Sequence, residues 1–262
     1  MTIIITGTST GIGFALAEYF GKKGHSVFGL SRKNVISAYF KTIPTDITDN
    51  LQVQNAVSEI LKTEKNIDVL INNAGMGMVG AVEDSTQEEI IKLFNLNLVG
   101  SVQMMSAVLP SMRAQKLGKI LNISSIGSEM GLPFRGFYSA SKSALDKVTE
   151  AIRYEVSPWN IEVCTLHLGD IKTKIAENRV KTKVSEPYQK TFDKIYAIMN
   201  AHVDDGTEPA EVAAYIEKLL TKKSWKAHYY FGKFGQKIGV PLKWILPQNF
   251  YENLMRKYNQ MD

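Results

Sequence analysis

The feature that most constrains the fold is an alternation of short apolar runs with longer segments of helical pattern. We predict strands over Thr2–Thr6, Ser26–Leu30, Val69–Asn72, Lys119–Ile123, Glu162–His167 and His228–Phe231. We predict helices over Gly11–Lys23, Asn50–Thr63, Thr86–Gln115, Gly136–Ser157 and Pro209–Thr221. Pro110 is expected to bend or end the third helix. Such alternation is typical of β-α-β units, so we expect an α/β protein with a doubly wound parallel sheet and helices on both faces.

Length and composition indicate an ordinary globular protein. The 262 residues, 44% of them hydrophobic, can bury one sizeable core, and we expect one domain over residues 1–262. Cys164 is the only cysteine, which excludes an intrachain disulfide and predicts a buried structural thiol. The four histidines are scattered without ligand spacing, so we expect no metal site.

The start of the chain and its apolar runs bear on location. The first strand begins at Thr2, which leaves no room for a signal peptide. No apolar stretch reaches the ~18–20 residues of a membrane span. We therefore expect a cytoplasmic protein without a transmembrane segment.

The formal net charge of +5 is concentrated near the C-terminus. From Lys222 onward there are eight Lys and Arg residues and two Asp and Glu residues, whereas the first 221 residues hold 23 basic and 24 acidic side chains. A protein that binds nucleic acid usually carries a basic face on its folded domain. We therefore expect no nucleic-acid partner.

A glycine-rich loop joins the first strand to the first helix. It reads Thr-Gly-Thr-Ser-Thr-Gly-Ile-Gly over residues 6–13. Glycines let the backbone amides approach a phosphate closely, and the N-terminus of the following helix offers unpaired N–H groups. The position between a strand and a helix favours a nucleotide-phosphate loop over a plain turn.

Tyr138 and Lys142 stand four residues apart, so that on a helix they share one face. A phenol titrates near pH ~10, and a neighbouring cation favours its ionised form. Ser125, thirteen residues before the tyrosine, can hydrogen-bond a substrate oxygen. The three side chains predict a proton-transfer site for alcohol–carbonyl interconversion, with a solvated helix surface as the alternative.

With these motifs in order, the chain resembles the short-chain dehydrogenase/reductase family over roughly residues 2–175. The motifs are the glycine loop, Asn72-Asn73-Ala74-Gly75, Asn97 with Gly100, Ser124-Ser125, Tyr138 with Lys142, and Leu168-Gly169-Asp170-Ile171-Lys172-Thr173. The resemblance implies a Rossmann-type fold and a nicotinamide cofactor that supplies the hydride.

The resemblance also implies a role for each catalytic residue. Tyr138 would give a proton to a carbonyl oxygen or remove one from an alcohol. Lys142 would lower the pKa of the tyrosine and bond the nicotinamide ribose, and Ser125 would hold the substrate oxygen. Asn97 would organise a water linking Lys142 to solvent; bending its helix or bonding a backbone group is the alternative.

NADP is the expected cofactor, with NAD as the alternative. Ser31 stands where NAD enzymes usually place an acid, and Arg32 follows it. A guanidinium can bind a 2′-phosphate in bidentate fashion, although Arg32 and Lys33 could also be a solvated pair. The family's other basic position is Thr10 here. The predicted cofactor-binding residues are Gly7, Ser9, Thr10, Gly11, Ile12, Gly13, Ser31, Arg32, Asp46, Ile47, Asn73, Ala74, Gly75, Tyr138, Lys142, Gly169, Ile171 and Thr173.

Two segments are expected to set specificity. Residues 172–206 carry an amphipathic pattern between Tyr188 and Met199 and are predicted to form a substrate lid, or a plain surface helix. Residues 232–262 form a basic, aromatic tail that packs on the core, docks on a partner subunit or contacts an anionic membrane. We expect a homodimer or homotetramer.

The predicted function is that of an NADP(H)-dependent oxidoreductase that interconverts an alcohol and a ketone or aldehyde, with a small, lipophilic substrate. The alternatives are a reductase of fatty or carrier-linked 3-oxoacyl groups and a non-catalytic NADP-sensing regulator. A regulator would have no need of the Ser125, Tyr138 and Lys142 set.

Overall fold

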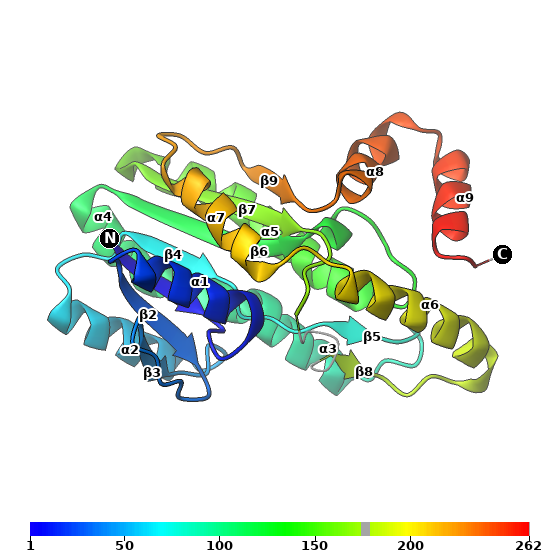
Figure 1. Cartoon of the computed structure of the whole chain (residues 1–262), viewed down its shortest axis with the longest axis horizontal. Coiled ribbons are helices and arrows are strands. Elements are labelled where there is room, and N and C mark those ends of the chain that lie inside the picture. The colour runs from blue at the N-terminus through cyan, green and yellow to red at the C-terminus, as the bar shows by residue number, and fades with distance from the viewer. Residues whose placement is uncertain (174–178, 262) are drawn as a thin grey trace.

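The predicted parallel sheet is present in the computed structural model, which describes residues 1–173 and 179–261. Its seven strands are β1 Thr2–Thr6, β2 Ser26–Ser31, β3 Lys41–Pro44, β4 Val69–Asn72, β6 Gly118–Ser125, β7 Ile161–Leu168 and β9 His228–Phe231. They pair in parallel in the order β3-β2-β1-β4-β6-β7-β9 (Figure 1). The chain therefore has the expected doubly wound, Rossmann-type fold in a single domain.

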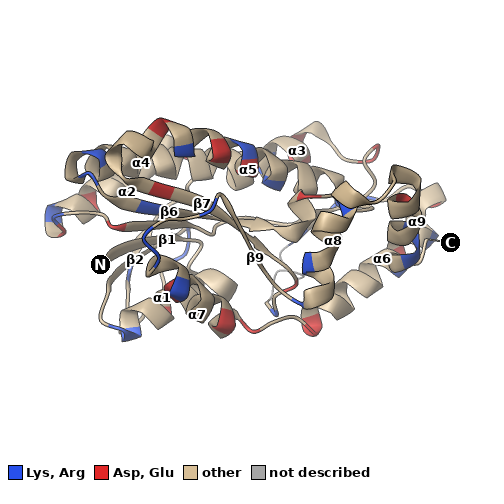
Figure 2. Ribbon diagram, turned by 90° about the horizontal axis from the view of Figure 1, so that it is seen from above, with Lys and Arg blue, Asp and Glu red and all other residues tan. Residues whose placement is uncertain are grey.

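Helices cover both faces of this sheet, and α6, α8 and α9 lie beyond the carboxyl ends of its strands (Figure 2). The helices of the described residues are α1 Gly11–Lys22, α2 Asn50–Thr63, α3 Gln87–Phe94, α4 Gly100–Gln115, α5 Gly136–Val156, α6 Glu186–Asp204, α7 Pro209–Leu220, α8 Phe234–Ile245 and α9 Gln248–Tyr258. Short helical turns lie at η1 Asn95–Val99, η2 Ile126–Ser128 and η3 Ser157–Trp159. A second sheet pairs β5 Met78–Val79 with β8 Val180–Lys181.

Because side chains alternate along each strand, the sheet has a hydrophobic core on each of its two faces. In β1, Ile3 and Ile5 face α1 and α7, whereas Ile4 between them faces α2 and α4. Successive side chains of a strand point to opposite faces, which is why an uninterrupted apolar strand can serve both layers. Cys164 is fully buried in the first core, where burial raises the pKa of its thiol, as expected of a structural cysteine.

The long middle helix differs from the prediction. Pro110 lies inside α4, which continues to Gln115, so the proline does not end the helix. Both Ser106, four residues earlier, and Pro110 are exposed, so water can bond the carbonyl that the proline leaves without a donor. The irregularity lies instead at η1, a π-helical turn between α3 and α4.

The helix of residues 87–115 is also apolar and long enough to cross a membrane. Half of its qualifying window is buried inside the fold, as in the core helix of a globular protein. Among the described residues it is the one helix that passes this test of length and composition.

The carboxyl ends of the strands point toward a group of elements whose bounds the sequence did not predict. β5, β8, α6, α8 and α9 all lie at this end of the molecule (Figure 1). The predicted lid contains β8 and α6, whose Phe192, Ile195 and Met199 are buried; its residues 174–178 lie outside the described residues. The edge strand β3 was missed because it is short and none of its four residues is fully buried.

Candidate active site

The glycine loop takes the conformation that a phosphate site needs. Gly7 and Gly11 have positive φ angles of 75° and 60°, which L-residues rarely adopt. A Cβ on Gly13 would lie 2.3 Å from the carbonyl oxygen of Gly7, so only glycine lets α1 approach the loop this closely. Thr10 precedes α1, and its side chain does not cap the helix, which leaves first-turn N–H groups for an anion.

The predicted motif around Asn73 fixes this loop to the next strand. The Asn73 side chain donates to the carbonyl oxygens of Thr6 at 2.9 Å and Gly7 at 3.3 Å. In return, the Thr6 hydroxyl accepts from the backbone N–H groups of Asn73 and Ala74. These bonds hold the ends of β1 and β4 together, so Asn73 and Ala74 act on a cofactor site at least through the backbone of the loop.

The three predicted catalytic side chains come from β6 and α5. Ser125 ends β6, and Tyr138 and Lys142 lie one turn apart at the start of α5. A hydrogen bond joins Ser125 to the Tyr138 phenol. Lys142 is buried and donates from Nζ to the carbonyl oxygen of Ile123 at 2.8 Å. Strand β6 thus holds the Ser125 hydroxyl at the phenol, and it bonds the Lys142 ammonium one helical turn further along α5.

Burial dominates the titration of this site. Desolvation raises the pKa of Tyr138, against the hydrogen bond with Ser125 and the charges of Arg135 and Arg179, which lower it. Desolvation also lowers the pKa of Lys142 to about 8, with Asp146 acting in the opposite direction. At neutral pH the phenol keeps its proton, and Lys142 is charged but close to titration.

Asn97 lies in the π-helical turn η1 and is fully buried. Its Oδ1 accepts from the N–H of Met76 at 2.8 Å, and its Nδ2 donates to the Met76 carbonyl oxygen at 3.0 Å and the Ser141 hydroxyl at 3.1 Å. A Cβ on Gly75 would lie 3.1 Å from this Oδ1 and 3.4 Å from Lys142 Nζ. Asn97 therefore stands beside Lys142 and ties the segment after β4 to α5.

The residues expected to select the cofactor lie at the ends of β2 and β3. Ser31 is buried, and its hydroxyl donates to the carbonyl oxygen of Lys33 at 2.6 Å. Arg32 is exposed and makes no ion pair or hydrogen bond within the described ranges. Asp46 accepts from the N–H and hydroxyl of Thr48, and the buried Ile47 packs on Gly100.

The loop after β7 is held by the tail. The side chain of Gln236 in α8 accepts from the N–H of Asp170 at 3.3 Å and donates to its carboxylate. A Cβ on Gly169 would collide with the same amide. Ile171 is buried and bridges to Thr207, and Thr173 lies beside Gly11. The tail thereby fixes the loop after β7.

Sequence reasoning missed two arginines and a buried histidine. Arg135 and Arg179 both act on the pKa of Tyr138, although one precedes α5 and the other precedes β8. His167 is fully buried behind Ser125: its Nδ1 lies 3.2 Å from the Ser125 carbonyl oxygen, and its Nε2 lies 3.0 Å from His228 Nδ1. Two of the histidines that looked scattered are therefore in contact. Sequence spacing carries no signal for any of these contacts.

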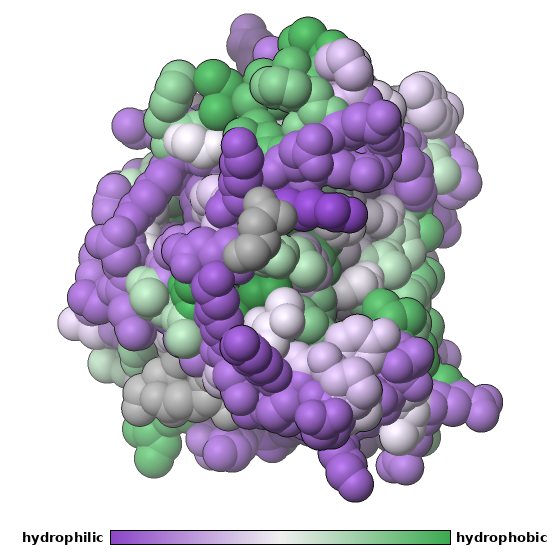
Figure 3. All heavy atoms as spheres, turned by 90° about the vertical axis from the view of Figure 1, so that its right-hand side faces the viewer, coloured by the Kyte–Doolittle hydropathy of each residue, from purple (hydrophilic) through white to green (hydrophobic). Residues whose placement is uncertain are grey.

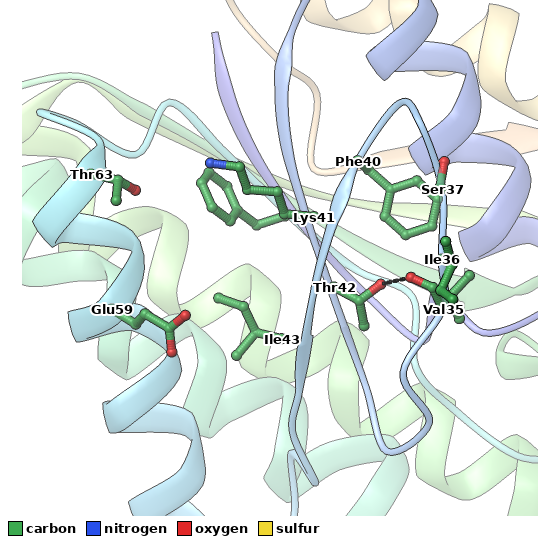
Figure 4. Close-up of a pocket in the computed structure, with 10 residues that line it drawn as sticks. Val35, Ile36, Ser37, Phe40, Lys41, Thr42, Ile43, Glu59 and Thr63 are labelled. Atoms are coloured by element: carbon green, nitrogen blue, oxygen red, sulfur yellow. Dashed lines mark hydrogen bonds between the residues drawn. The ribbon is translucent and has the colours of Figure 1, made fainter.

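Cavity shape does not identify this site. A cavity of about 430 Å³ lies at the sheet edge between β3, the loop before it and α2 (Figure 4). Val35, Phe40, Ile43 and Glu59 line it, and it contains none of the predicted site residues. Convergence of the side chains at the carboxyl end of the sheet locates the candidate active site instead.

Comparisons with known proteins agree with this geometry. The family model described as short chain dehydrogenase matches residues 1–184. A protein named 3-ketodihydrosphingosine reductase, from Bacteroides thetaiotaomicron, is 38% identical over 97% of this chain and 96% of its own. A protein named NADPH-dependent 3-dehydrocapnine reductase, from Ornithobacterium rhinotracheale, is 34% identical over 86% of each chain. The crystal structure of a short-chain dehydrogenase from Streptomyces avermitilis matches with a TM-score of 0.84 at 26% identity, over 98% of this chain and 97% of that one.

Proposed function

The chain belongs to the short-chain dehydrogenase/reductase family, and from this we propose that it is an NADPH-dependent reductase that converts a lipophilic ketone into the corresponding alcohol. The observation that carries the proposal is the hydrogen bond between Ser125 and the Tyr138 phenol, with Lys142 buried one helical turn further along α5. Two relatives named as reductases, one of them of a 3-keto compound, support the same direction.

The proton chemistry favours reduction. Because burial raises the pKa of Tyr138, the phenol holds a proton at neutral pH and can give it to a carbonyl oxygen. Ser125 holds that oxygen in place, and the charge on Lys142 stabilises the phenolate that remains. When bound, the nicotinamide supplies the hydride, so that the carbonyl carbon gains two electrons and the oxygen gains the proton.

The described residues fit a phosphorylated dinucleotide. Gly7, Gly11 and Gly13 bring backbone close to the N-terminus of α1, and the hydroxyl of Thr8 is buried there without a partner among the described residues. Arg32 would hold the 2′-phosphate, since it is exposed at the end of β2 and no acid stands in the place of Ser31. These residues support NADP over NAD.

The tail supports a lipophilic substrate and a peripheral membrane position. In α8 and α9, Phe234, Trp244, Ile245 and Phe250 are 76%, 75%, 75% and 60% exposed. Hydrophobic residues gather over these helices at the top of Figure 3. Five basic side chains accompany them: Lys233, Lys237, Lys243, Arg256 and Lys257. We propose that α8 and α9 contact a bilayer containing anionic phospholipid, because this surface is both apolar and basic.

Vesicle sedimentation of the full chain tests the membrane contact. We expect binding to vesicles of phosphatidylcholine with phosphatidylglycerol, weaker binding to phosphatidylcholine alone, and loss of binding in the double variant Trp244→Ser with Ile245→Ser. Leu51→Ser, which changes an equally exposed residue of α2, should bind like wild type. Absence of binding, or self-association through the tail instead, would contradict the membrane proposal.

Turnover tests the proposed activity. We expect consumption of NADPH, and much less of NADH, with long-chain ketones, and recovery of the alcohol by mass spectrometry. Ser125→Ala should lower kcat/KM by about 10²-fold or more. Ser124→Ala is the matched control, because this hydroxyl is buried without a partner in the described part of the chain. Equal activity of the two variants would count against the mechanism.

The same assay distinguishes the proposed ketone reductase from the two alternative functions. Preference for a 3-oxoacyl thioester over simple ketones would favour the acyl reductase. Tight NADPH binding without turnover of any carbonyl compound would favour the regulator.

A further inference from the structure

The charges of two guanidinium groups, those of Arg135 and Arg179, reach Tyr138. Arg135 directly precedes α5, three residues before the tyrosine, and its carbonyl oxygen accepts from the N–H of Ser139. Arg179 directly precedes β8, and its Nη1 donates to Asn200 Oδ1 in α6 at 2.8 Å. The stem of Arg179 passes close to Gly77, where a Cβ would lie 2.8 Å from Arg179 Cγ. The backbone of α5 and the second sheet therefore hold both cations near the reacting phenol.

Within residues 1–173 and 179–261, no acidic side chain forms an ion pair with either arginine of this pair. The Nε of Arg135 is shut off from solvent and makes no hydrogen bond in the described part of the chain. The charge of Asp170 reaches both guanidinium groups without forming an ion pair with either, and its carboxylate accepts from the Gln236 amide. Two half-buried cations without an ion-pair partner among the described residues are costly, and a bound anion would offset that cost.

The residues around Arg135 and Arg179 indicate which chemical group would be attached to an anion bound there. Burial lowers the pKa of both guanidinium groups, and the Arg179 charge also interacts with Tyr196. Tyr196 packs with Val79, Phe192 and Met199, which are buried, in an apolar cluster beside β8. An anionic group at the arginines would thus lie between the phenol and an apolar wall.

We propose that Arg135 and Arg179 bind an oxyanion, a carboxylate, phosphate or sulfonate group, that the ketone substrate carries within a few bonds of its carbonyl carbon. The substrate is then an anionic amphiphile whose hydrocarbon part lies along the cluster of Val79, Phe192, Tyr196 and Met199. This inference rests on the proposed ketone reduction and adds the charge of the substrate to it. The cofactor phosphates are assigned to the glycine loop and Arg32, so they do not account for the pair.

Matched ketones of equal chain length test the proposal. The probes are a 2-oxoalkyl phosphonate, a 2-oxoalkyl sulfonate, an uncharged 2-alkanone and a 2-oxoalkyl trimethylammonium, each assayed with NADPH. Because charge-assisted hydrogen bonds contribute about 1.5–3 kcal/mol, we expect wild type to prefer the anionic ketones by about 10- to 100-fold in kcat/KM. The trimethylammonium ketone should be the poorest substrate. No preference for the anionic ketones would overturn the proposal.

Variants assign the preference to the pair. Arg135→Gln and Arg179→Gln should lose about tenfold or more on the anionic ketones, mainly through KM, and change the uncharged ketone far less. Arg179→Lys, which keeps the charge, should recover part of the loss. Arg113→Gln changes an exposed arginine at the far end of α4 and should keep the wild-type preference. An equal loss on charged and uncharged ketones would mean that the arginines serve Tyr138 or the fold, and the proposal would fail.

Binding without turnover separates this inference from the proposed activity. If no ketone is reduced, the proposed function fails, and the anion site is tested alone by titrating an alkyl phosphonate into the NADPH-loaded protein in a calorimeter. Binding that is lost in Arg179→Gln would support the site. Absence of binding, or equal binding of the matched alkyl trimethylammonium, would overturn it.

Discussion

The proton chemistry depends on two side chains whose titration is set by burial. Tyr138 keeps its proton because desolvation outweighs the nearby cations, and Lys142 carries a charge that its buried position opposes. The buried charge of Lys142 therefore lowers the stability of the folded chain, and the proposed reaction uses this charge. Such costs are expected where a site is built for chemistry.

Lys142→Met should make the protein more stable at pH 7 while removing activity. The pKa of Lys142 falls from 10.5 to about 8 on folding, which corresponds to about 3 kcal/mol of destabilisation below pH 8. The lost bond to the Ile123 carbonyl offsets about 1 kcal/mol of the gain. Urea unfolding at pH 7 measures the difference.

The size of this effect depends on pH. Between pH 8 and 10.5 the unfolded chain binds more protons at Lys142 than the folded chain does, so wild type gains stability as pH rises. The advantage of Lys142→Met should therefore vanish near pH 10. Lys147→Met, an exposed change on the same helix, is the control. A difference that stayed constant with pH would refute the buried cation.

Arg32→Ala should weaken NADPH binding far more than NADH binding. The guanidinium is exposed at the end of β2 and would lose its bidentate contact with the 2′-phosphate, a loss of about tenfold or more. Fluorescence titration with both cofactors measures the two dissociation constants. Equal losses for the two would show that Arg32 does not contact the 2′-phosphate.

Single residues differ in how far the sequence predicts them. Ser125, Tyr138 and Lys142 follow from spacing, because a strand end and one helix turn are local structures. Arg135 and Arg179 do not, because their burial arises from packing of segments far apart in the chain. From the sequence alone, both arginines resemble ordinary charged residues of the protein surface.

The helix predicted over Thr86–Gln115 shows that the sequence also fails to predict some features of whole elements. A proline was expected to interrupt it, whereas the π-helical turn at Asn95–Val99 does so and leaves Pro110 inside a continuing helix. No periodicity marks the turn, because its stability comes from the bonds of Asn97 to Met76 and Ser141. π-helical turns often accompany functional sites.

Asn97→Ala should lower the free energy of unfolding by about 1–3 kcal/mol, because it leaves the N–H and carbonyl of Met76 without their partner. Turnover should fall as well, since the segment beside Lys142 loosens. Asn95→Ala, an exposed change in the same turn, should have little effect on either quantity. Urea denaturation and steady-state kinetics measure the two, and equal stability of both variants would contradict this role.

The sequence also did not determine where the tail helices α8 and α9 pack. Their apolar and basic residues allowed three placements, and the protein combines packing with exposure. Val240 and Tyr251 are buried against Ile126 and Met130, whereas most other large apolar residues of the tail face outward. Which side chains face inward depends on the α8–α9 connection, which local pattern does not determine.

The molecule as a whole follows from its alternation of strands and helices. Parallel strands bring the ends of β1, β4, β6 and β7 to one edge, which is why Gly7, Asn73, Ser125 and Gly169 lie along that edge although they are distant in sequence. The sequence therefore predicts which loops lie at this edge, and their binding of a cofactor stays a prediction. The proposed substrate half comprises α6, β8 and the tail, whose arrangement the sequence does not predict.

Turnover by Tyr138→Phe, measured beside NADPH binding on the same sample, tests the proposed mechanism. The variant keeps the ring and its packing but has no proton to give. We expect NADPH to bind as in wild type, while kcat for reduction of a long-chain ketone falls by about 10²-fold or more. Equal turnover by Tyr138→Phe and wild type would contradict the assignment of Tyr138 as proton donor.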